Sequence, residues 1–250
     1  MNMTTIDCDV LVIGSGAGGL AAAIAARKQG LDVLVVEKEP VFGGTTAFSG
    51  GVLWIPGNSH CPAAKDDSRA AAREYIRNEA GTWFDAAAVD AFLDNAPAMV
   101  EWFERETSVA FVPTLYPDYH PTVKGGVDIG RSILAKPFDI RALGADMARL
   151  RPPLKTITFI GMMFNSSNAD LKHFFRATKS LTSFIYVAKR LANHLKELAL
   201  YRRGINVTSG NALAARLAHS ALSIGVPIWT SAPAKKLLDQ AGRVTGAIVS

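Results

Sequence analysis

The first forty residues constrain the fold of this chain more than any other segment. Residues 8–13 (CDVLVI) form a short apolar run that is typical of a buried strand. The alanine-rich stretch 18–28 predicts a helix, and Gly30 marks the point after its end. A second apolar run at 33–36 (VLVV) predicts another buried strand. This order of strand, helix and strand, with short connections, predicts a parallel sheet.

Three glycines, Gly14, Gly16 and Gly19, lie where the first predicted strand ends and the helix begins. Gly14 suits a tight turn, Gly16 lets the backbone approach a pyrophosphate, and Gly19 lets the helix pack closely on the strand. The helix N-terminus then offers N–H groups and a positive dipole end to phosphates. Glu37 ends the second strand, where a carboxylate accepts hydrogen bonds from a ribose diol. Together these residues predict a dinucleotide site.

A long loop follows Glu37, over residues 38–58. A nicotinamide-binding domain normally continues from its acidic residue into the next helix, whereas this chain runs a glycine-rich loop back toward the cofactor. Four glycines allow close backbone approach to a flat or anionic group: Gly43, Gly44, Gly50 and Gly51. Three hydroxyl side chains offer hydrogen-bond donors: Thr45, Thr46 and Ser49. Loops of this length are usually functional.

These segments resemble a known family. The run GSGAGG…VEKEPVFGGTTAFSGGVLWIPGN is similar to the flavin-binding N-terminus of the fumarate reductase/succinate dehydrogenase flavoprotein superfamily, in particular its 3-ketosteroid Δ1-dehydrogenase-like branch. The resemblance implies FAD as cofactor, with the GGT and SGG glycines along it. It also implies contacts from the remaining residues of the two motifs: Ser15, Ala17, Gly18 and Lys38.

The C-terminal part of the chain supports the same resemblance. Residues 208–213 (TSGNAL) open a predicted helix and resemble the G-x-A-L segment of that family. Predicted strands at 226–230, 234–238 and 244–249 resemble its β-meander, which implies that the backbone of Ala234 meets the adenine. The expected fold is therefore α/β, a Rossmann-like FAD-binding domain with a parallel sheet and a β-meander. We expect this domain at 1–58 and 205–250, and a mainly helical insertion on the substrate side at 59–204.

Residues 116–121 (YPDYHP) form the second recognisable segment. It resembles the P-D-Y segment of ketosteroid dehydrogenases, whose tyrosine lines the active site, and that position is Tyr119. A phenol donates a hydrogen bond to an oxygen or tunes a neighbouring base; the alternative is a loop tyrosine with a solvated hydroxyl. His120 is a weaker candidate base before a turn proline. Arg131 is a candidate carboxylate clamp, although an ion pair with Asp128 or Asp139 is the stronger expectation.

The net charge of +5 is unevenly distributed. Residues 151–203 carry ten Lys or Arg against only Asp170 and Glu197, so this segment is +8 and the rest of the chain is −3. It is also rich in Phe and Met, and we expect two helices that meet near Ser180. The segment is a candidate wall for a small apolar substrate or a peripheral contact with an anionic membrane. The alternative is an ordinary helical face with solvated charges.

Several functional classes are excluded by the sequence. It contains no H-E-x-x-H, C-x-x-C or G-x-S-x-G motif, so neither a metal site nor serine-hydrolase chemistry is expected. The sequence has no basic stripe with interleaved aromatic residues, so no nucleic-acid partner is expected. Cys8 and Cys61 are too few for a disulfide scaffold and fit a reducing, cytoplasmic location. We expect neither a transmembrane helix nor a signal peptide.

The resemblance implies an FAD-dependent oxidoreductase that dehydrogenates adjacent carbons of an apolar ketone such as a 3-ketosteroid. A base would take a proton beside the carbonyl while FAD accepts a hydride, and an unidentified electron acceptor would reoxidise the flavin. Two alternatives stay open: fumarate reductase-like reduction of an enoate, and a non-catalytic FAD-binding fragment. At 250 residues the chain is shorter than members of that family, and it ends within a predicted strand. We therefore expect it to be the N-terminal portion of a longer flavoenzyme.

Overall fold

A computed structural model describes residues 5–60, 68–164 and 169–250 of the chain. Cys61 lies outside these residues. The chain divides into two compact units. The first comprises Met1–Ser49, Pro137–Phe164 and Arg190–Ser250, and the second comprises Gly50–Lys136 and Asn165–Lys189. Helix α5 (Leu181–Tyr201) contributes to both. None of the described helices is long and apolar enough to cross a membrane.

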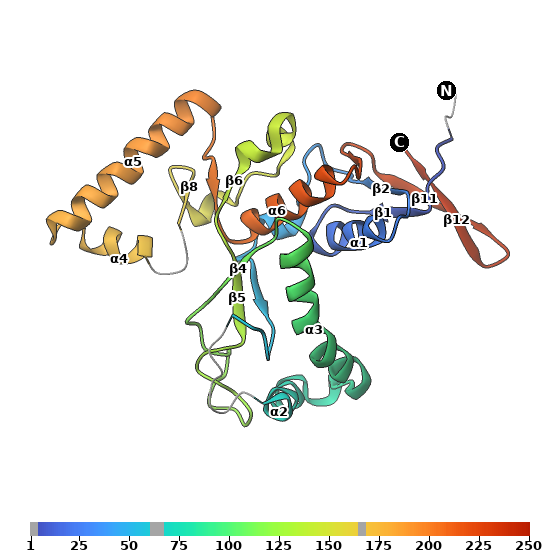
Figure 1. The fold of residues 1–250 in the computed structure, drawn as a ribbon, viewed down its shortest axis with the longest axis horizontal. Coiled ribbons are helices and arrows are strands. Elements are labelled where there is room, and N and C mark those ends of the chain that lie inside the picture. The colour runs from blue at the N-terminus through green and yellow to red at the C-terminus, as the bar shows by residue number, and fades with distance from the viewer. Residues whose placement is uncertain (1–4, 61–67, 165–168) are drawn as a thin grey trace. The chain divides into compact units, whose positions relative to one another are not determined.

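The centre of the first unit is a parallel sheet in the order β1 (Val10–Ile13), β2 (Val33–Val36) and β10 (Ile228–Trp229). Strand β1 pairs with β2 in register Val10 with Val33, and β10 pairs with the end of β2. All four residues of β2 are buried because the strand lies between two neighbours. The predicted βαβ unit is therefore present (Figure 1).

Two helices of the first unit pack together beside this sheet (Figure 1). Helix α1 (Ala17–Lys28) contacts β1 and β2, and buries Leu20, Ala23 and Ile24. Helix α6 (Ser209–Ser223) is largely buried and contacts α1 and the short helical turn η1 (Thr45–Phe48). Small side chains on both helices permit this close approach.

The C-terminal strands differ from the expected β-meander in their pairing. Strands β11 (Ala234–Gln240) and β12 (Arg243–Val249) form an antiparallel hairpin, as predicted. The strand before them, β10, instead joins the parallel sheet beside β2. The physical reason is burial: Val226 and Ile228 are both buried, whereas most residues of β11 are exposed.

The remaining elements of the first unit are short. They are β6 (Phe138–Asp139), η3 (Ile140–Arg149), η4 (Lys155–Ile157), β7 (Thr158–Phe159), β8 (Met162–Met163) and β9 (Asn206–Val207). Strands β7 and β8 form a tight hairpin, so the apolar residues 158–163 form two short strands and not a helix. Strands β6 and β9 pair with each other.

The second unit combines helices with a small antiparallel sheet. Its helices are α2 (Arg69–Ala80), the short η2 (Gly81–Trp83), α3 (Ala86–Glu106) and α4 (Ala169–Arg176). Its sheet has the order β3 (Val52–Trp54), β5 (Ser132–Ala135) and β4 (Phe111–Pro113). Ser68 and Asp85 cap α2 and α3 with their side chains, which fixes where these helices begin. The predicted break near Ser180 is present, because α4 ends at Arg176 and α5 begins at Leu181.

Candidate functional site

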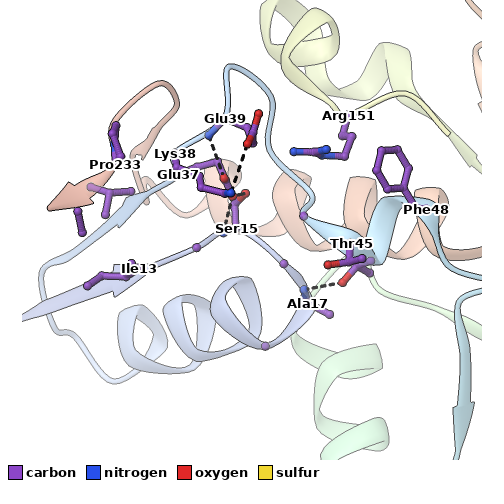
Figure 2. Close-up of a pocket in the computed structure, with 17 residues that line it drawn as sticks. Ile13, Ser15, Ala17, Glu37, Lys38, Glu39, Thr45, Phe48, Arg151 and Pro233 are labelled. Atoms are coloured by element: carbon purple, nitrogen blue, oxygen red, sulfur yellow. Dashed lines mark hydrogen bonds and ion pairs between the residues drawn. The ribbon is translucent and has the colours of Figure 1, made fainter. Parts of the chain in front are cut away.

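A cavity of about 690 Å³ lies in the first unit, at the carboxyl ends of β1 and β2 and the N-terminus of α1 (Figure 2). This is where open parallel sheets bind ligands, and the volume suits a cofactor. Its lining residues come from five short segments: Ile13, Gly14, Ser15, Gly16, Ala17, Gly18, Val36, Glu37, Lys38, Glu39, Gly44, Thr45, Thr46, Phe48, Arg151, Pro233 and Ala234.

The glycine motif forms the turn between β1 and α1. Gly14 has φ +102°, a backbone conformation that residues with a side chain rarely adopt. Its N–H donates to the Val36 carbonyl at 2.8 Å. A Cβ added to Gly19 would overlap the Gly14 carbonyl oxygen. Gly19 is therefore needed for the close approach of α1 to the turn, while Gly16 and Gly18 line the cavity.

The Glu37 carboxylate lies at the end of β2 and is only 5% exposed. Its Oε2 accepts hydrogen bonds from the Ser15 N–H at 3.0 Å and the Ser15 hydroxyl at 2.5 Å, and its Oε1 accepts from the Glu39 N–H at 3.1 Å. Burial alone would raise the pKa of Glu37. The hydrogen bonds from Ser15 and Glu39, together with the nearby charge of Arg151, lower that pKa below its ordinary value. The side chain is thus held as an anion at the cavity wall.

Side-chain hydrogen bonds join the glycine-rich loop to the glycine motif. The Thr46 hydroxyl accepts from the Ala17 N–H at 3.0 Å, at the first turn of α1. The Ser15 hydroxyl, which donates to Glu37, accepts from the Gly43 N–H at 3.1 Å. A Cβ added to Gly44 would lie 3.1 Å from the Gly16 Cα, so the two loops meet closely through glycine. These contacts bring residues 44–46 to the cavity.

Helix α6 supports the same loop from its N-terminus. The Gly210 N–H donates to the Ser49 carbonyl at 3.1 Å, and a Cβ on Gly210 would overlap the Thr46 carbonyl oxygen. The Asn211 side chain donates to the Ala47 carbonyl at 3.3 Å and to the Arg151 carbonyl at 2.8 Å. The segment 208–213 therefore positions the cavity wall and does not line it.

Eleven of the sixteen predicted cofactor residues line the cavity: Gly14, Ser15, Gly16, Ala17, Gly18, Glu37, Lys38, Gly44, Thr45, Thr46 and Ala234. Five others do not line it: Gly19, Gly43, Ser49, Gly50 and Gly51. Gly43 packs against Ala47 and Ala214, while Ser49 donates to the Thr46 carbonyl at 2.9 Å. Gly50 and Gly51 belong to the second unit. The contacts of all sixteen residues with a cofactor stay predictions.

Arg151 and Phe48 also line the cavity, although neither is predicted from the sequence. Arg151 is half-buried and its guanidinium lies over the Phe48 ring, with Cζ 5.1 Å from the ring centre. Arg151 follows η3 and is far from the glycine motif in the chain. A single arginine before two prolines carries no motif, so only the folded chain could show that it lines the cavity.

In the second unit, the P-D-Y segment has a buried aspartate, Asp118, followed by an exposed tyrosine, Tyr119. Asp118 is buried and accepts from the Trp54 indole at 2.7 Å, the Arg131 guanidinium at 2.8 Å and the Val127 N–H at 3.1 Å. The predicted partner of Arg131, Asp128 or Asp139, is therefore wrong. Asp118 is buried beside Arg131, whereas Asp139 pairs with its own neighbour Arg141.

Tyr119 and His120 lie on the surface of the second unit. Tyr119 is 97% exposed, so the second unit by itself does not enclose it in a pocket. Its catalytic role stays a prediction. His120 Nδ1 lies 2.9 Å from Glu79, and its side chain is 65% exposed. That contact favours the structural interpretation of His120 over that of a base.

A second cavity of about 260 Å³ lies within the first unit, among residues that begin at Pro152 and end at Val207. Met162, Met163 and Leu198 contribute apolar surface, but Arg190 and Arg203 also line it. The basic segment thus forms a mixed wall, and its role toward a substrate stays a prediction. Among the described residues no group of three or more His, Cys, Asp or Glu is placed to hold a metal ion.

Comparisons with known proteins agree with this geometry. Residues 9–250 match the FAD binding domain family. The chain is 44% identical to 4-oxocyclohex-2-ene-1-carboxylate 5-dehydrogenase of Sinomonas cyclohexanicum, over 98% of this chain and 41% of that protein. It is 34% identical to 3-oxosteroid 1-dehydrogenase of Mycobacterium tuberculosis, over 99% of this chain and 43% of that protein.

A solved structure gives the same result. The crystal structure of 3-ketosteroid Δ1-dehydrogenase from Sterolibacterium denitrificans, in complex with 1,4-androstadiene-3,17-dione, matches with a TM-score of 0.85 and 34% identity. The match covers 97% of this chain and 44% of that one. The chain therefore spans less than half the length of these relatives.

Proposed function

The chain belongs to the FAD binding domain family, and from this premise we propose that the protein is an FAD-dependent dehydrogenase of cyclic ketones. The observation that carries the proposal is the 44% identity, over almost the whole chain, to a dehydrogenase named for a ring that bears a ketone. The 3-oxosteroid dehydrogenase relatives act on the same kind of group in a larger ring system, by their names. The reaction proposed is removal of hydrogens from adjacent ring carbons beside the carbonyl.

The residues of the first cavity fit FAD. The α1 N-terminus provides N–H donors for the phosphates, and where Gly16 and Gly44 meet, that part of the wall is free of side chains. Glu37, held ionised by its hydrogen bonds, is a candidate acceptor for the ribose hydroxyls. Bound FAD would supply a hydride acceptor for the substrate carbon. We propose that Tyr119 donates a hydrogen bond to the substrate carbonyl or tunes the base beside it.

The fumarate reductase-like alternative needs a cationic clamp for the carboxylates of its substrate. Arg131 was the candidate from the sequence. Its side chain is fully buried against Asp118, which is itself 2% exposed at the side chain. A guanidinium in such a pair serves the fold of its unit, so the ketone reaction is the favoured proposal.

The cofactor and the reaction are tested separately. The purified protein should show the absorbance bands of an oxidised flavin, or gain them on reconstitution with FAD. Under anaerobic conditions a 3-ketosteroid or 4-oxocyclohexanecarboxylate should bleach the flavin. If only fumarate, added to dithionite-reduced protein, changes the flavin spectrum, the ketone proposal is wrong. A protein that takes up no flavin at all contradicts the cofactor site itself.

Tyr119 is tested by substitution with phenylalanine. Tyr119→Phe should slow anaerobic bleaching by the ketone while it leaves the flavin spectrum unchanged, because only the hydroxyl is removed. Tyr116→Phe, in the same loop, is the matched control and should react at the wild-type rate. Equal rates for wild type and Tyr119→Phe would remove Tyr119 from the mechanism.

The basic segment 151–203 is proposed to make a peripheral membrane contact of a cytoplasmic protein. Support comes from exposed apolar side chains, Phe175, Leu181 and Phe184, on a segment of net charge +8. Flotation with anionic liposomes at low salt, lost at high salt, is the expected result; no flotation at low salt contradicts the membrane contact.

We also propose that residues 1–58 and 205–250 form the FAD-binding domain and that residues 59–204 form the substrate side.

A further inference from the structure

Arg151 is a cation in the first cavity that no motif assigns. Its side chain is half-buried and lines the cavity together with Gly16, Thr46 and Phe48 (Figure 2). Among the described residues, its guanidinium makes no hydrogen bond and no ion pair, and its Nε is inaccessible to solvent without an acceptor. Buried donors without an acceptor are rare, and each calls for a physical explanation.

The backbone and the ring contact fix where this guanidinium lies. The Arg151 N–H donates to the Phe42 carbonyl at 2.9 Å, and the Arg151 carbonyl accepts from the Asn211 side chain at 2.8 Å. The guanidinium then lies over the Phe48 ring, with Cζ 5.1 Å from its centre. A guanidinium that lies over an aromatic ring is positioned in advance, and its N–H donors point outward in the plane of the guanidinium, where an acceptor can meet them.

Arg149, two residues earlier, shows what a structural arginine looks like in the same segment. Its guanidinium also lies near a ring, 5.8 Å from the centre of Phe42. Its donors, however, are taken up by the Asp146 carboxylate at 2.5 Å and by the Ile228 carbonyl. Among the described residues, the Arg149 guanidinium therefore has protein acceptors, whereas the Arg151 guanidinium lines the cavity without one.

The charged side chains of the cavity wall are Glu37, Lys38, Glu39 and Arg151. Lys38 pairs with Glu39 at 3.5 Å, whereas Arg151 has no ion pair among the described residues and is left for an anionic ligand group. The Glu37 carboxylate lies in the same wall, and Arg151 contributes to lowering its pKa. Glu37 already accepts from Ser15 and Glu39, so it does not take up the guanidinium donors. An anion beside the α1 N-terminus would be repelled by Glu37, and Arg151 opposes that repulsion.

We propose that Arg151 binds the diphosphate of the dinucleotide, opposite the N-terminus of α1. This inference rests on the proposal that FAD occupies the first cavity. In it, Gly16 and Gly18 offer backbone N–H groups from one side, since the Ala17 N–H is bonded to Thr46, and Arg151 offers a planar pair of charged donors from the other. The site is then completed by a residue from a part of the chain far outside the glycine motif.

The test compares ADP, which carries a diphosphate, with adenosine, which carries none. Binding of each to flavin-free protein is measured by calorimetry, and FAD binding by flavin fluorescence. Arg151→Gln should weaken ADP and FAD binding by about 10- to 100-fold and leave adenosine binding unchanged. Arg151→Lys keeps the charge but loses the planar fork, so its affinity for ADP should lie between those of the wild type and Arg151→Gln. The loss should also shrink at high salt.

Arg149→Gln is the matched control, expected to lower the unfolding temperature while it keeps the wild-type ratio of ADP to adenosine affinity. An Arg151→Gln protein that loses ADP and adenosine binding equally, or loses neither, overturns the proposal. Arg151→Lys is informative if Arg151→Gln does not fold: a lysine variant that keeps the full wild-type preference for ADP over adenosine would also overturn the proposal. Wild-type protein that binds neither FAD nor ADP contradicts the cofactor site as well.

Discussion

At the scale of single residues, Glu37 couples the cofactor cavity to the stability of the fold. The pKa of its carboxyl is lower in the folded protein than its ordinary value of 4.5, because three hydrogen bonds favour the anion over the cost of burial. The ionised form therefore contributes stability above that ordinary value. This contribution is lost as the pH falls through the lowered, folded pKa.

Glu37→Gln tests this coupling without ligand. As the pH falls below the ordinary value of 4.5, the unfolding temperature of the wild type should fall more steeply than that of the variant, because only in the wild type does unfolding take up a proton at Glu37. Thermal unfolding followed by circular dichroism gives both curves. Glu101→Gln, at an exposed position of α3, should keep the wild-type slope. Parallel curves for wild type and Glu37→Gln would contradict the assignment.

Asp118 is a second residue whose charge matters to the fold. Asp118→Asn leaves the fully buried Arg131 without its anion, and removing one member of a buried pair costs about 3 kcal/mol or more. Urea unfolding should show this loss. Asp128→Asn changes an exposed aspartate in the same loop and is expected to alter the free energy of unfolding by less than about 0.5 kcal/mol. Equal effects of the two variants would exclude a special role for Asp118.

At the scale of elements, the approach of α1 to the turn after β1 depends on one missing side chain. An alanine Cβ at position 19 would overlap the Gly14 carbonyl, whereas one at position 18 meets nothing within 4 Å. Gly19→Ala should destabilise the flavin-free protein by about 1–3 kcal/mol through overpacking. Gly18→Ala should be neutral or slightly stabilising, because alanine favours a helix.

Unfolding in urea, without flavin, measures both variants, since a methyl group on Gly18 faces the cavity and would complicate cofactor binding. A Gly19→Ala protein as stable as Gly18→Ala would show that α1 can shift away from the turn. The same comparison would then weaken the structural explanation of the third glycine of the motif.

At the scale of the whole molecule, the described cavity lies entirely within the first compact unit. Two predicted cofactor residues, Gly50 and Gly51, begin the second unit. Hydrogen exchange with and without FAD should show slower exchange at 13–18 and 37–48. If Gly50 and Gly51 contact the flavin, as the sequence predicts, protection extends to residues 50–52. Protection that stops at Ser49 would remove both glycines from the cofactor site.

The sequence alone determined the parts of the fold that local patterns encode. Strand β2, helix α1 and the turn at Gly14 were predictable because apolar periodicity and glycine act within a few residues. Ten of the eleven predicted cavity residues lie in two short motifs, some expected from the chemistry of those motifs and others from their resemblance to a known family. Ala234, the first residue of β11, was expected from the resemblance alone. The cofactor and the family followed from those motifs.

Only the tertiary structure decided the contacts between distant segments. No local pattern shows that β10 pairs with β2, or that Asp118 rather than Asp128 or Asp139 neutralises Arg131. Arg151 reaches the cavity because η3 and α6 bring its backbone beside Phe42 and Asn211. Such pairings depend on packing and burial across the whole unit, whereas sequence motifs report only what neighbouring residues can do. The glycine motif thus specifies a dinucleotide, and the fold supplies the cation that faces it.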